Sequence, residues 1–438
     1  MNSLLRHWKP DSKVLEKVKI KEDKGTTKIA GFGQLKSQSL PEWAEENIRL
    51  YVSSVAEKEK GMYAGIDING TAYSIIKTAP GKVELGNADG IINALLDEEY
   101  YPKKRPSYSY FPFPYTKIPV FARLFLFKVL LKFKKDPGFP AWPVEKSVEA
   151  IRHLFMGALS HAYGKPADYI GFWPKGQEFA LLLTHDCDSE TAFKWVEYIR
   201  EMEKNYGFRS SWNIVPKKYY IDFQKLRYLK KEGCEIGIHD YDHTGSLPYL
   251  GREEIAKRIS ESKKLLSEFN PQGFRSALLN RNAEFLSVLA ESMLYDSSIP
   301  DTDIYSPVYF RNGACTIYPF FIKSMVELPL SMQQDFRLKR MGMKPKQIAE
   351  AWKLKLDFIA RVGGLATLNV HPDDFISGSE KYLNAYEDFM KYASKLNPWN
   401  EIPANAALWW KERDSAALKD GKIIGSKRVE IKSFAEKL

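Results

Sequence analysis

The sequence lacks the features that would place a chain in or across a membrane. Its first residues, MNSLLRHWKPDSK, contain neither an apolar core nor a small-residue cleavage site, so no secretory signal peptide is expected. It has no uninterrupted run of 18 or more apolar residues, and we therefore expect no membrane-spanning helix. Internal repeats and low-complexity tracts are absent as well.

Cysteine is scarce. The chain has three, Cys187, Cys234 and Cys315, an odd number without the spacing of a metal-binding cysteine motif. Such a pattern is typical of thiols that are kept reduced, and it predicts a cytoplasmic protein.

What is present indicates a folded chain. Its 438 residues, 44% hydrophobic and 27% charged, suffice for two or three domains with a buried core. The formal charge of +10 suggests an anionic partner but does not distinguish nucleic acid, membrane and acidic glycan. Because no recognised nucleic-acid motif accompanies the basic residues, we expect no nucleic-acid partner.

Residues 1–165 are expected to form an accessory region of mixed α and β structure. Residues 40–61 carry Trp43, Ile48, Leu50 and Val52 at a spacing that we interpret as helical. Residues 62–79 predict a β-hairpin, because two β-rich runs flank Asn69-Gly70, a pair suited to a tight turn.

Residues 101–135 contain nine Lys or Arg and no acid. A helix is predicted within this segment, and it would either pack the accessory region onto the rest of the chain or lie at an anionic membrane surface. The second interpretation would place the protein peripherally at the inner membrane face. The predicted apolar stripe consists of Ala122, Phe125, Leu126, Val129, Leu130 and Phe133.

From about residue 170 to 400, strand-like runs alternate with helical stretches. This alternation predicts a parallel α/β fold, either an open sheet or a barrel, in which the chemistry lies at the carboxyl ends of the strands. A helical, basic tail is expected over 401–438. The strand-like runs are FALLLTHD (179–186), SSWNIVP (210–216), CEIGIHD (234–240) and ATLNVH (366–371).

All histidines in the second half of the chain lie at or just after these predicted strands. Asp188, His239 and His243 together offer a carboxylate and two imidazoles, and the two histidines would face one point if the chain turned helically after the strand. Two histidines and one carboxylate suit zinc or another divalent first-row ion. Alternatively, Asp188 is a helix N-cap, HDYDH is a surface loop and His371 only ends a strand. Their shared position after strands favours the metal site.

Five segments resemble, in order, the motifs of the polysaccharide deacetylases with a NodB-homology domain, carbohydrate esterase family four. The resemblance covers residues 170–400 and implies a distorted (β/α) barrel. This sequence departs from the usual pattern where Cys187 separates the two acids, where no proline and aromatic residue follow Arg275, and at Pro300, where tryptophan is frequent. The matching segments are THDCD, GCEIGIHDYDH, GFRSALLN, YDSSIP and LNVHP.

The resemblance also implies roles for individual residues. Asp188, His239 and His243 would hold one divalent ion, with Zn²⁺ the expected metal. The catalytic set would comprise the base Asp186, Arg275 to orient it, the general acid His371 and Asp296 to tune that histidine. We further expect His185 to pack beneath the site and Cys187 to point to the core.

These roles predict a metal-dependent hydrolase that removes N-acetyl groups from a sugar of a glycan or glycan precursor in cell-surface glycan biosynthesis. Amide hydrolysis needs an activated water, stabilisation of the oxyanion and a proton for the leaving amine, and the implied residues could supply all three. Two alternatives remain open at this point: hydrolysis of a non-sugar amide or formamide, and a pseudoenzyme that binds carbohydrate without turning it over.

Overall fold

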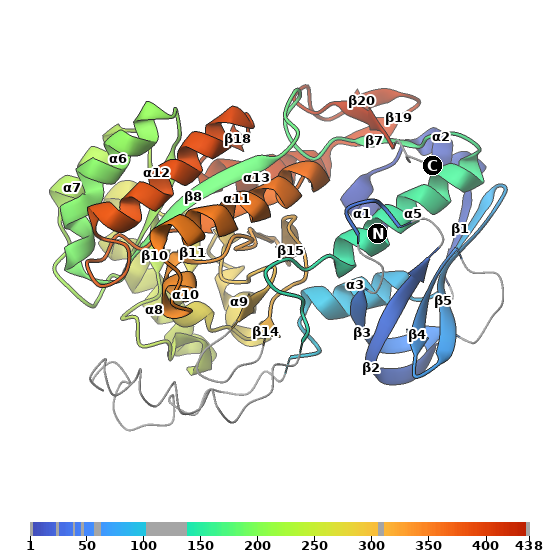
Figure 1. The fold of residues 1–438 in the computed structure, drawn as a ribbon, viewed down its shortest axis with the longest axis horizontal. Coiled ribbons are helices and arrows are strands. Elements are labelled where there is room, and N and C mark those ends of the chain that lie inside the picture. The colour runs from blue at the N-terminus through green and yellow to red at the C-terminus, as the bar shows by residue number, and fades with distance from the viewer. Residues whose placement is uncertain are drawn as a thin grey trace.

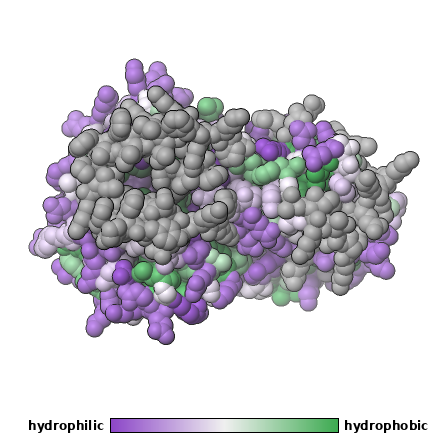
Figure 2. Space-filling model, turned by 90° about the horizontal axis from the view of Figure 1, so that it is seen from below, coloured by the Kyte–Doolittle hydropathy of each residue, from purple (hydrophilic) through white to green (hydrophobic). Residues whose placement is uncertain are grey.

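The computed structural model describes residues 3–22, 26–37, 40–44, 48–56, 63–101, 138–304 and 311–434. Figure 1 shows an α/β region, in which helices surround a curved sheet, beside a separate sheet formed by the N-terminal part of the chain. Both chain ends lie at the side of this N-terminal sheet (Figure 1). Figure 2 shows one face of the molecule, on which hydrophilic residues surround small groups of hydrophobic ones.

The N-terminal sheet confirms the predicted hairpin. Strands β4 and β5 pair in antiparallel fashion, and the residues between them, Asn69 and Gly70, have φ angles of 52° and 79°. Both angles are positive, as a type I′ turn requires, and asparagine and glycine tolerate them best. In order across the sheet, the strands are β1 (Lys19–Glu22), β6 (Lys82–Leu85), β5 (Thr71–Ala79), β4 (Ala64–Ile68), β2 (Thr26–Ser37) and β3 (Arg49–Ala56).

The predicted helix over residues 40–61 is wrong. Strand β3 covers Arg49–Ala56 and pairs with β2. Leu50 and Val52 are both fully buried, whereas Tyr51 between them is only partly buried. A spacing of two residues places side chains on one face of a strand, so the apolar residues of this segment follow the period of a strand rather than that of a helix.

The predicted basic helix lies almost entirely within residues 102–137, outside the described residues. Its membrane contact therefore stays a prediction. Among the helices that the structure describes, none combines the length and the apolar character needed to cross a bilayer.

The second sheet confirms the predicted α/β fold and its distorted barrel. Seven strands run parallel in the order β17 (Leu365–Asn369), β8 (Ala180–Cys187), β9 (Ser210–Ile214), β10 (Glu235–His239), β11 (Gly273–Arg275), β12 (Tyr295–Asp296) and β16 (Met325–Glu327). β15 (Phe320–Ile322) adds an antiparallel edge to β16, and β18 (Trp399–Asn400) pairs with the start of β8.

The barrel closes irregularly, at a place that we call its seam. There the backbone that bonds to β17 follows β16 and is not part of a strand. The chain beyond β16 reaches β17 on the other side: Met332 N donates to Thr367 O at 3.1 Å, and Thr367 N donates to Ser331 Oγ at 2.9 Å. These bonds satisfy the edge of β17 where a regular barrel would place another strand.

Helices cover the outside of the barrel, and the chain then returns to the N-terminal region. After α13 a hairpin of β19 (Ala417–Lys419) and β20 (Lys422–Ile424) follows, and β21 (Ile431–Ser433) pairs with β7 (Asp168–Ile170). The expected C-terminal tail thus contains strands as well as a helix. The covering helices are α6 (Val196–Asn205), α7 (Phe223–Lys231), α8 (Arg252–Leu265), α9 (Ala283–Leu289), α11 (Pro345–Val362), α12 (Glu380–Lys395) and α13 (Pro403–Ser415).

Shorter and N-terminal elements complete the described fold. α5 packs on β5, and α1 contacts both α3 and α5. Both ends of the described chain therefore meet on the same layer of helices. These elements are α1 (Ser3–Trp8), α2 (Ser12–Lys17), α3 (Ala88–Leu96), α5 (Ser147–Tyr163), α10 (Asp335–Arg340), β13 (Asp303–Ile304) and β14 (Arg311–Asn312).

Candidate metal centre and catalytic site

The predicted site residues meet at one edge of the barrel, which we call the carboxyl edge: the ends of β8, β10, β11 and β17. The strand register aligns them, since Asp186 lies opposite Asn213 and His239 lies opposite Arg275. His371 follows the end of β17 by two residues. Parallel strands place all these side chains at one end of the sheet because their carboxyl termini coincide.

Asp188, His239 and His243 form a compact group in which one ligand atom from each lies within 4.8 Å of the others. The Oδ1 atom of Asp188 is 3.2 Å from His239 Nε2 and 2.9 Å from His243 Nε2. Both histidines are buried, and Asp188 is partly buried. The structure thus brings together the three residues predicted to hold a metal.

The turn that places His243 differs from the expected one. Instead of a helical turn, the HDYDH segment contains two left-handed residues, Asp240 and His243, each with a φ angle of 59°. Left-handed backbone is costly for a residue with a side chain, and it brings the His243 ring back beside His239, at a ring distance of 4.9 Å.

The hydrogen bonds and charges of this group fit a divalent cation. His239 Nδ1 donates to the Arg275 carbonyl oxygen at 2.9 Å, so Nε2, which faces Asp188, is the ring nitrogen that could bind a metal ion. Burial would raise the pKa of Asp188, but His243 and hydrogen bonds from both histidines hold it well below the ordinary value. Burial lowers the pKa of His243, which favours the neutral, ligating form of the ring.

Asp186, the predicted base, is buried between two amide groups. Its Oδ1 accepts from Asn213 Nδ2 and its Oδ2 from Asn369 Nδ2, each at 2.7 Å. Burial alone would raise the pKa of Asp186, but Arg275, His239 and His371 outweigh that effect and lower it to about 2. The carboxylate is therefore ionised and held in one orientation.

Arg275 lies beside the base but is oriented mainly by other groups. Its Nη1 is 3.5 Å from Asp186 Oδ2 and donates to Thr184 Oγ1 at 3.0 Å. Its Nε and Nη2 donate to the carbonyl and hydroxyl oxygens of Ser297, both at 2.9 Å. The guanidinium is 1% exposed, so its charge acts on Asp186 with little screening by solvent.

His371, the predicted acid, pairs with Asp335. Its Nδ1 donates to Asp335 Oδ1 at 2.6 Å, and its backbone N donates to Asp335 Oδ2 at 2.8 Å. Burial would lower the pKa of His371, but Asp335 and, to a smaller extent, Asp188 and Asp186 raise it to about 10. The protonated form of His371 is therefore favoured at neutral pH, and it is stabilised further by Asp186 in β8 and by Asp188 just after the end of β8.

The prediction that Asp296 tunes His371 is wrong. Asp296 Oδ1 accepts from Ser298 Oγ at 2.8 Å, and Asp296 lies opposite Glu327 in the β12–β16 register. Burial raises the pKa of both carboxyls, and Asp296 raises that of Glu327 further, so Asp296 belongs to a buried acid pair within the sheet. Asp335 takes the tuning role because the irregular seam brings the start of α10 to the end of β17.

Asp373 is another residue that the sequence did not reveal. Its Oδ2 accepts from the backbone N of Asp188 at 3.0 Å and its Oδ1 from Ser189 Oγ at 2.5 Å. Burial and the charge of Asp188 raise the pKa of Asp373 to about 7. Ser189, not Asp188, caps the following helical turn, so Asp188 is not engaged as an N-cap.

The remaining residues of THDCD are structural. Beneath the site, His185 contacts Val370 O at 2.9 Å and Glu203 Oε1 at 2.8 Å, and its ring packs 4.4 Å from that of Trp212. Cys187 is fully buried, and burial raises its pKa well above the ordinary value, so it is an unreactive thiol. All three cysteines are free and buried.

Comparison with known proteins gives fold similarities over about half of the chain. No protein-family model matches it, and no curated protein matches it in sequence. It is similar to a Mycobacterium smegmatis protein described as a polysaccharide deacetylase, with 22% identity over 55% of this chain and 92% of that one and a TM-score of 0.45.

Two further solved structures are similar over comparable lengths. Puue allantoinase has 16% identity over 55% of this chain and 93% of its own, with a TM-score of 0.43. A family 4 carbohydrate esterase from Streptomyces lividans, in complex with acetate, has 16% identity over 52% of this chain and 96% of its own, with a TM-score of 0.36. The roles of individual residues rest on the geometry of this chain.

Proposed function

We propose that this protein is a metal-dependent hydrolase that removes an N-acetyl group from a sugar of a glycan or glycan precursor. The observation that carries the proposal is the geometry at the carboxyl edge, where Asp186, held by two amides beside Arg275, and His371, bonded to Asp335, accompany the group of possible metal ligands. Asp186 has a pKa lowered to about 2 and His371 a pKa raised to about 10. Such a divergence of two titratable groups supports separate base and acid roles.

Asp188, His239 and His243 would hold the divalent ion, for which two imidazoles and a carboxylate are a suitable donor set. When bound, such an ion supplies Lewis-acid polarisation of a carbonyl oxygen. Zn²⁺ is the metal we propose, because its common catalytic sites use this kind of three-ligand set.

The residues of the chain supply the proton transfers. Asp186, held by Asn213 and Asn369, would take a proton from the attacking water at one of its carboxylate oxygens. Arg275 keeps that carboxylate ionised until the transfer. His371 would give the proton on Nε2 to the departing nitrogen, while Asp335 holds the opposite ring nitrogen.

A sugar substrate is supported by exposed aromatic side chains beyond the carboxyl edge. Tyr220 is 79% exposed in the segment after β9, and Phe375 is 61% exposed in the segment after β17. β9 and β17 are the two neighbours of β8, whose end carries Asp186. Exposed aromatic faces at these positions could stack on the apolar face of a sugar ring.

Acetate release from a panel of N-acetylated sugars, presented free, nucleotide-linked and lipid-linked, tests this proposal. Non-sugar amides and formamides in the same panel separate the proposed activity from hydrolysis on another substrate class. His371→Ala protein serves as the control for background hydrolysis. A wild-type protein that is metal-loaded and folded but releases nothing from any member of the panel would rule out the proposed activity.

A further inference from the structure

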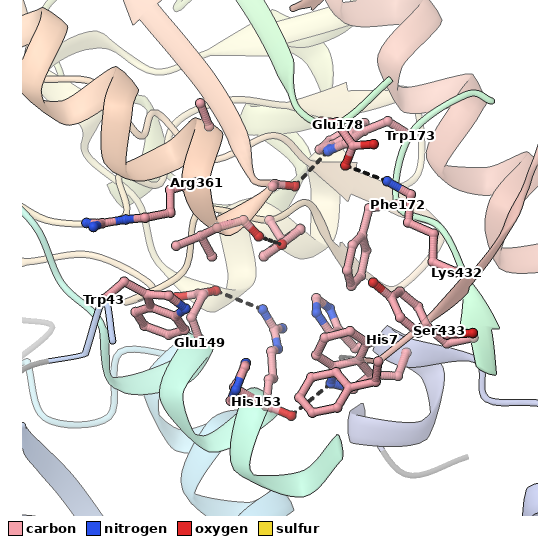
Figure 3. Close-up of a pocket in the computed structure, with 18 residues that line it drawn as sticks. His7, Trp43, Glu149, His153, Phe172, Trp173, Glu178, Arg361, Lys432 and Ser433 are labelled. Atoms are coloured by element: carbon pink, nitrogen blue, oxygen red, sulfur yellow. Dashed lines mark hydrogen bonds and ion pairs between the residues drawn. The ribbon is translucent and has the colours of Figure 1, made fainter. Parts of the chain in front are cut away.

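A cavity of about 270 Å³ lies at the other end of the barrel, before the starts of β8 and β17 (Figure 3). Its walls come from α1, α5 and β7, from the segments leading into β8 and β15, from the end of α11, and from β21. β8 is eight residues long, so roughly 25 Å of strand separates its two ends. The cavity is therefore distinct from the metal centre.

Arg152 of α5 lines this cavity and is only 4% exposed. Its Nη1 donates to Glu149 Oε1 at 3.1 Å and to Thr316 Oγ1 at 2.8 Å. Its Nε and Nη2 make no hydrogen bond to any residue that the structure describes. Neither atom is among the completely buried polar atoms that lack a partner. Part of the guanidinium therefore has donors available to an occupant of the cavity.

Two histidines beside Arg152 add further donors. Burial, together with the charges of Arg152 and Arg413, lowers the pKa of His7 well below its ordinary value. Burial lowers the pKa of His153 to about 4. Within the described part of the chain neither ring makes a hydrogen bond, and Figure 3 shows both rings at the cavity. Each neutral imidazole offers one N–H.

In and behind the cavity wall, buried positive charge exceeds buried negative charge, because Arg413 lies behind Phe172 although it does not line the cavity itself. Arg413, behind Phe172, donates only to the carbonyl oxygens of His7, Ile170 and Gly171, which are uncharged partners. Glu149 is the buried carboxylate among the described lining residues, and burial raises its pKa. At the rim, Glu178 is paired with Lys432 at 2.6 Å. The excess of buried positive charge favours an anion.

Much of the remaining wall is aromatic. In Figure 3, Trp43 and Phe172 stand on either side of the space that His7 and His153 face. A guanidinium with free donors binds carboxylate and phosphate oxygens well, and flat aromatic walls suit a ring. The other aromatic lining residues are Trp8, Tyr169, Trp173, Tyr318 and Phe434.

We propose that this cavity binds a small organic anion, namely a single ring of hexose size that carries a carboxylate or a phosphate. The cavity volume is close to the lower end of the range for small-ligand sites, about 300–1,000 Å³. The oxyanion would accept hydrogen bonds from Arg152 and the two histidines, and the ring would lie against the aromatic walls. This inference does not rest on the proposed hydrolytic activity.

Calorimetric titration of the full-length protein with four probes tests the proposal: glucuronate, glucose 6-phosphate, glucose and inorganic phosphate. Wild type should bind at least one of the two charged sugars, and the stronger of them identifies the oxyanion. Glucose should bind at least about tenfold more weakly, since it lacks the charged group. Binding of the charged sugar should weaken as salt rises.

One variant and two controls locate the site. Arg152→Lys should weaken binding by about tenfold or more, because a lysine cannot reproduce the planar guanidinium. Arg200→Lys is the matched control, since Arg200 is equally buried and forms the same i,i+3 pair with Glu203 on α6, away from the cavity. Asp188→Asn should bind as wild type does, which separates this site from the metal centre.

The outcomes are decisive even where one variant fails to fold. If Arg152→Lys is unfolded by circular dichroism, His153→Phe replaces it, and it should also weaken binding because one N–H donor is lost. The proposal is overturned if no charged sugar binds at about 10 mM, a concentration that detects even very weak sites. It is also overturned if glucose binds equally well, if phosphate binds while neither charged sugar does, or if the cavity variants bind like wild type.

Discussion

Histidines at the two ends of the barrel have pKa values that are shifted in opposite directions. His371, at the carboxyl edge, is buried among Asp335, Asp188 and Asp186, and its pKa is raised to about 10. His153, at the opposite cavity, is also largely buried, and there burial is the cause of the shift and lowers the pKa to about 4. Burial alone disfavours the charged ring at both places.

The difference teaches that burial by itself keeps a histidine neutral here, and that neighbouring carboxylates are what keep one charged. One end gathers carboxylates, so it favours cations and keeps a histidine charged. At the other end burial, together with the charges of Arg152 and Arg413, lowers the pKa of His7 and keeps its ring neutral, and the guanidinium groups favour anions. The predictions below test this contrast.

The largest effect is expected from the metal ligands. His239→Ala combined with His243→Ala removes two of three ligands, and activity should fall by about 10³-fold or more because carbonyl polarisation is lost. Elemental analysis should show metal content near zero. His161→Ala, an exposed histidine of α5, is the control that should keep its metal. Unchanged metal content in the double variant would refute the ligand assignment.

The base and the acid should act on protons without changing metal content. Asp186→Asn and His371→Ala are each expected to lower turnover by about 10²–10⁴-fold, the usual contribution of general acid–base catalysis. Steady-state kinetics and elemental analysis on the same preparations check this. Loss of metal in both variants would show that these side chains hold the ion instead.

Asp335→Asn should have a smaller effect on turnover and a distinct effect on pH dependence. An acid must be protonated, so activity should fall as pH rises through the pKa of His371, which Asp335 raises to about 10. Without that charge the descending limb should move to lower pH, and a pH–rate profile measures it. Asp296→Asn is the comparison variant, because Asp296 does not contact His371; an equal shift in both would contradict the pairing.

The pairing of His371 also has a consequence for stability. Its pKa is raised above the unfolded value of about 6.5, so the stabilisation is fully present below pH 6.5 and is lost as pH rises towards about 10. Denaturant titrations of Asp335→Asn and wild type should therefore converge at high pH. A difference that stays constant across this range would contradict the linkage.

The smallest effect is expected at His153, with the opposite sign. Its pKa is depressed to about 4, so its neutral form stabilises the fold above pH 6.5 and that contribution is lost as pH falls towards 4. His153→Phe should reduce this acid sensitivity in thermal melts between pH 7 and pH 4. His161→Phe, exposed on the same helix, is the matched control and should retain it.

Much of the carboxyl edge followed from local sequence. Asp188, His239 and His243 stand at fixed distances from apolar runs that can only be buried strands, and parallel strands bring their ends together. Asn213 and Asn369 lie inside such runs, and the sequence could have identified them as site residues. A buried amide in a strand needs a hydrogen-bonding partner, and both side chains donate to Asp186.

The N-terminal sheet was harder to predict. Around Leu50 the apolar residues are spaced by two, which is the period of a strand, and pairing with β2 forms that strand. The Asn69-Gly70 turn was predictable, because its positive φ angles are a local demand that few residues meet.

The sequence by itself therefore determined the α/β fold class, the strand ends and the positions of the proposed metal ligands at those ends, because hydrophobic period and strand polarity are local properties. Only the tertiary structure decided that Asp335 rather than Asp296 pairs with His371, since the irregular barrel seam joins residues 36 positions apart. It also created the cavity around Arg152, whose walls come from both ends of the chain. Such contacts depend on how distant segments pack, and no local pattern encodes that packing.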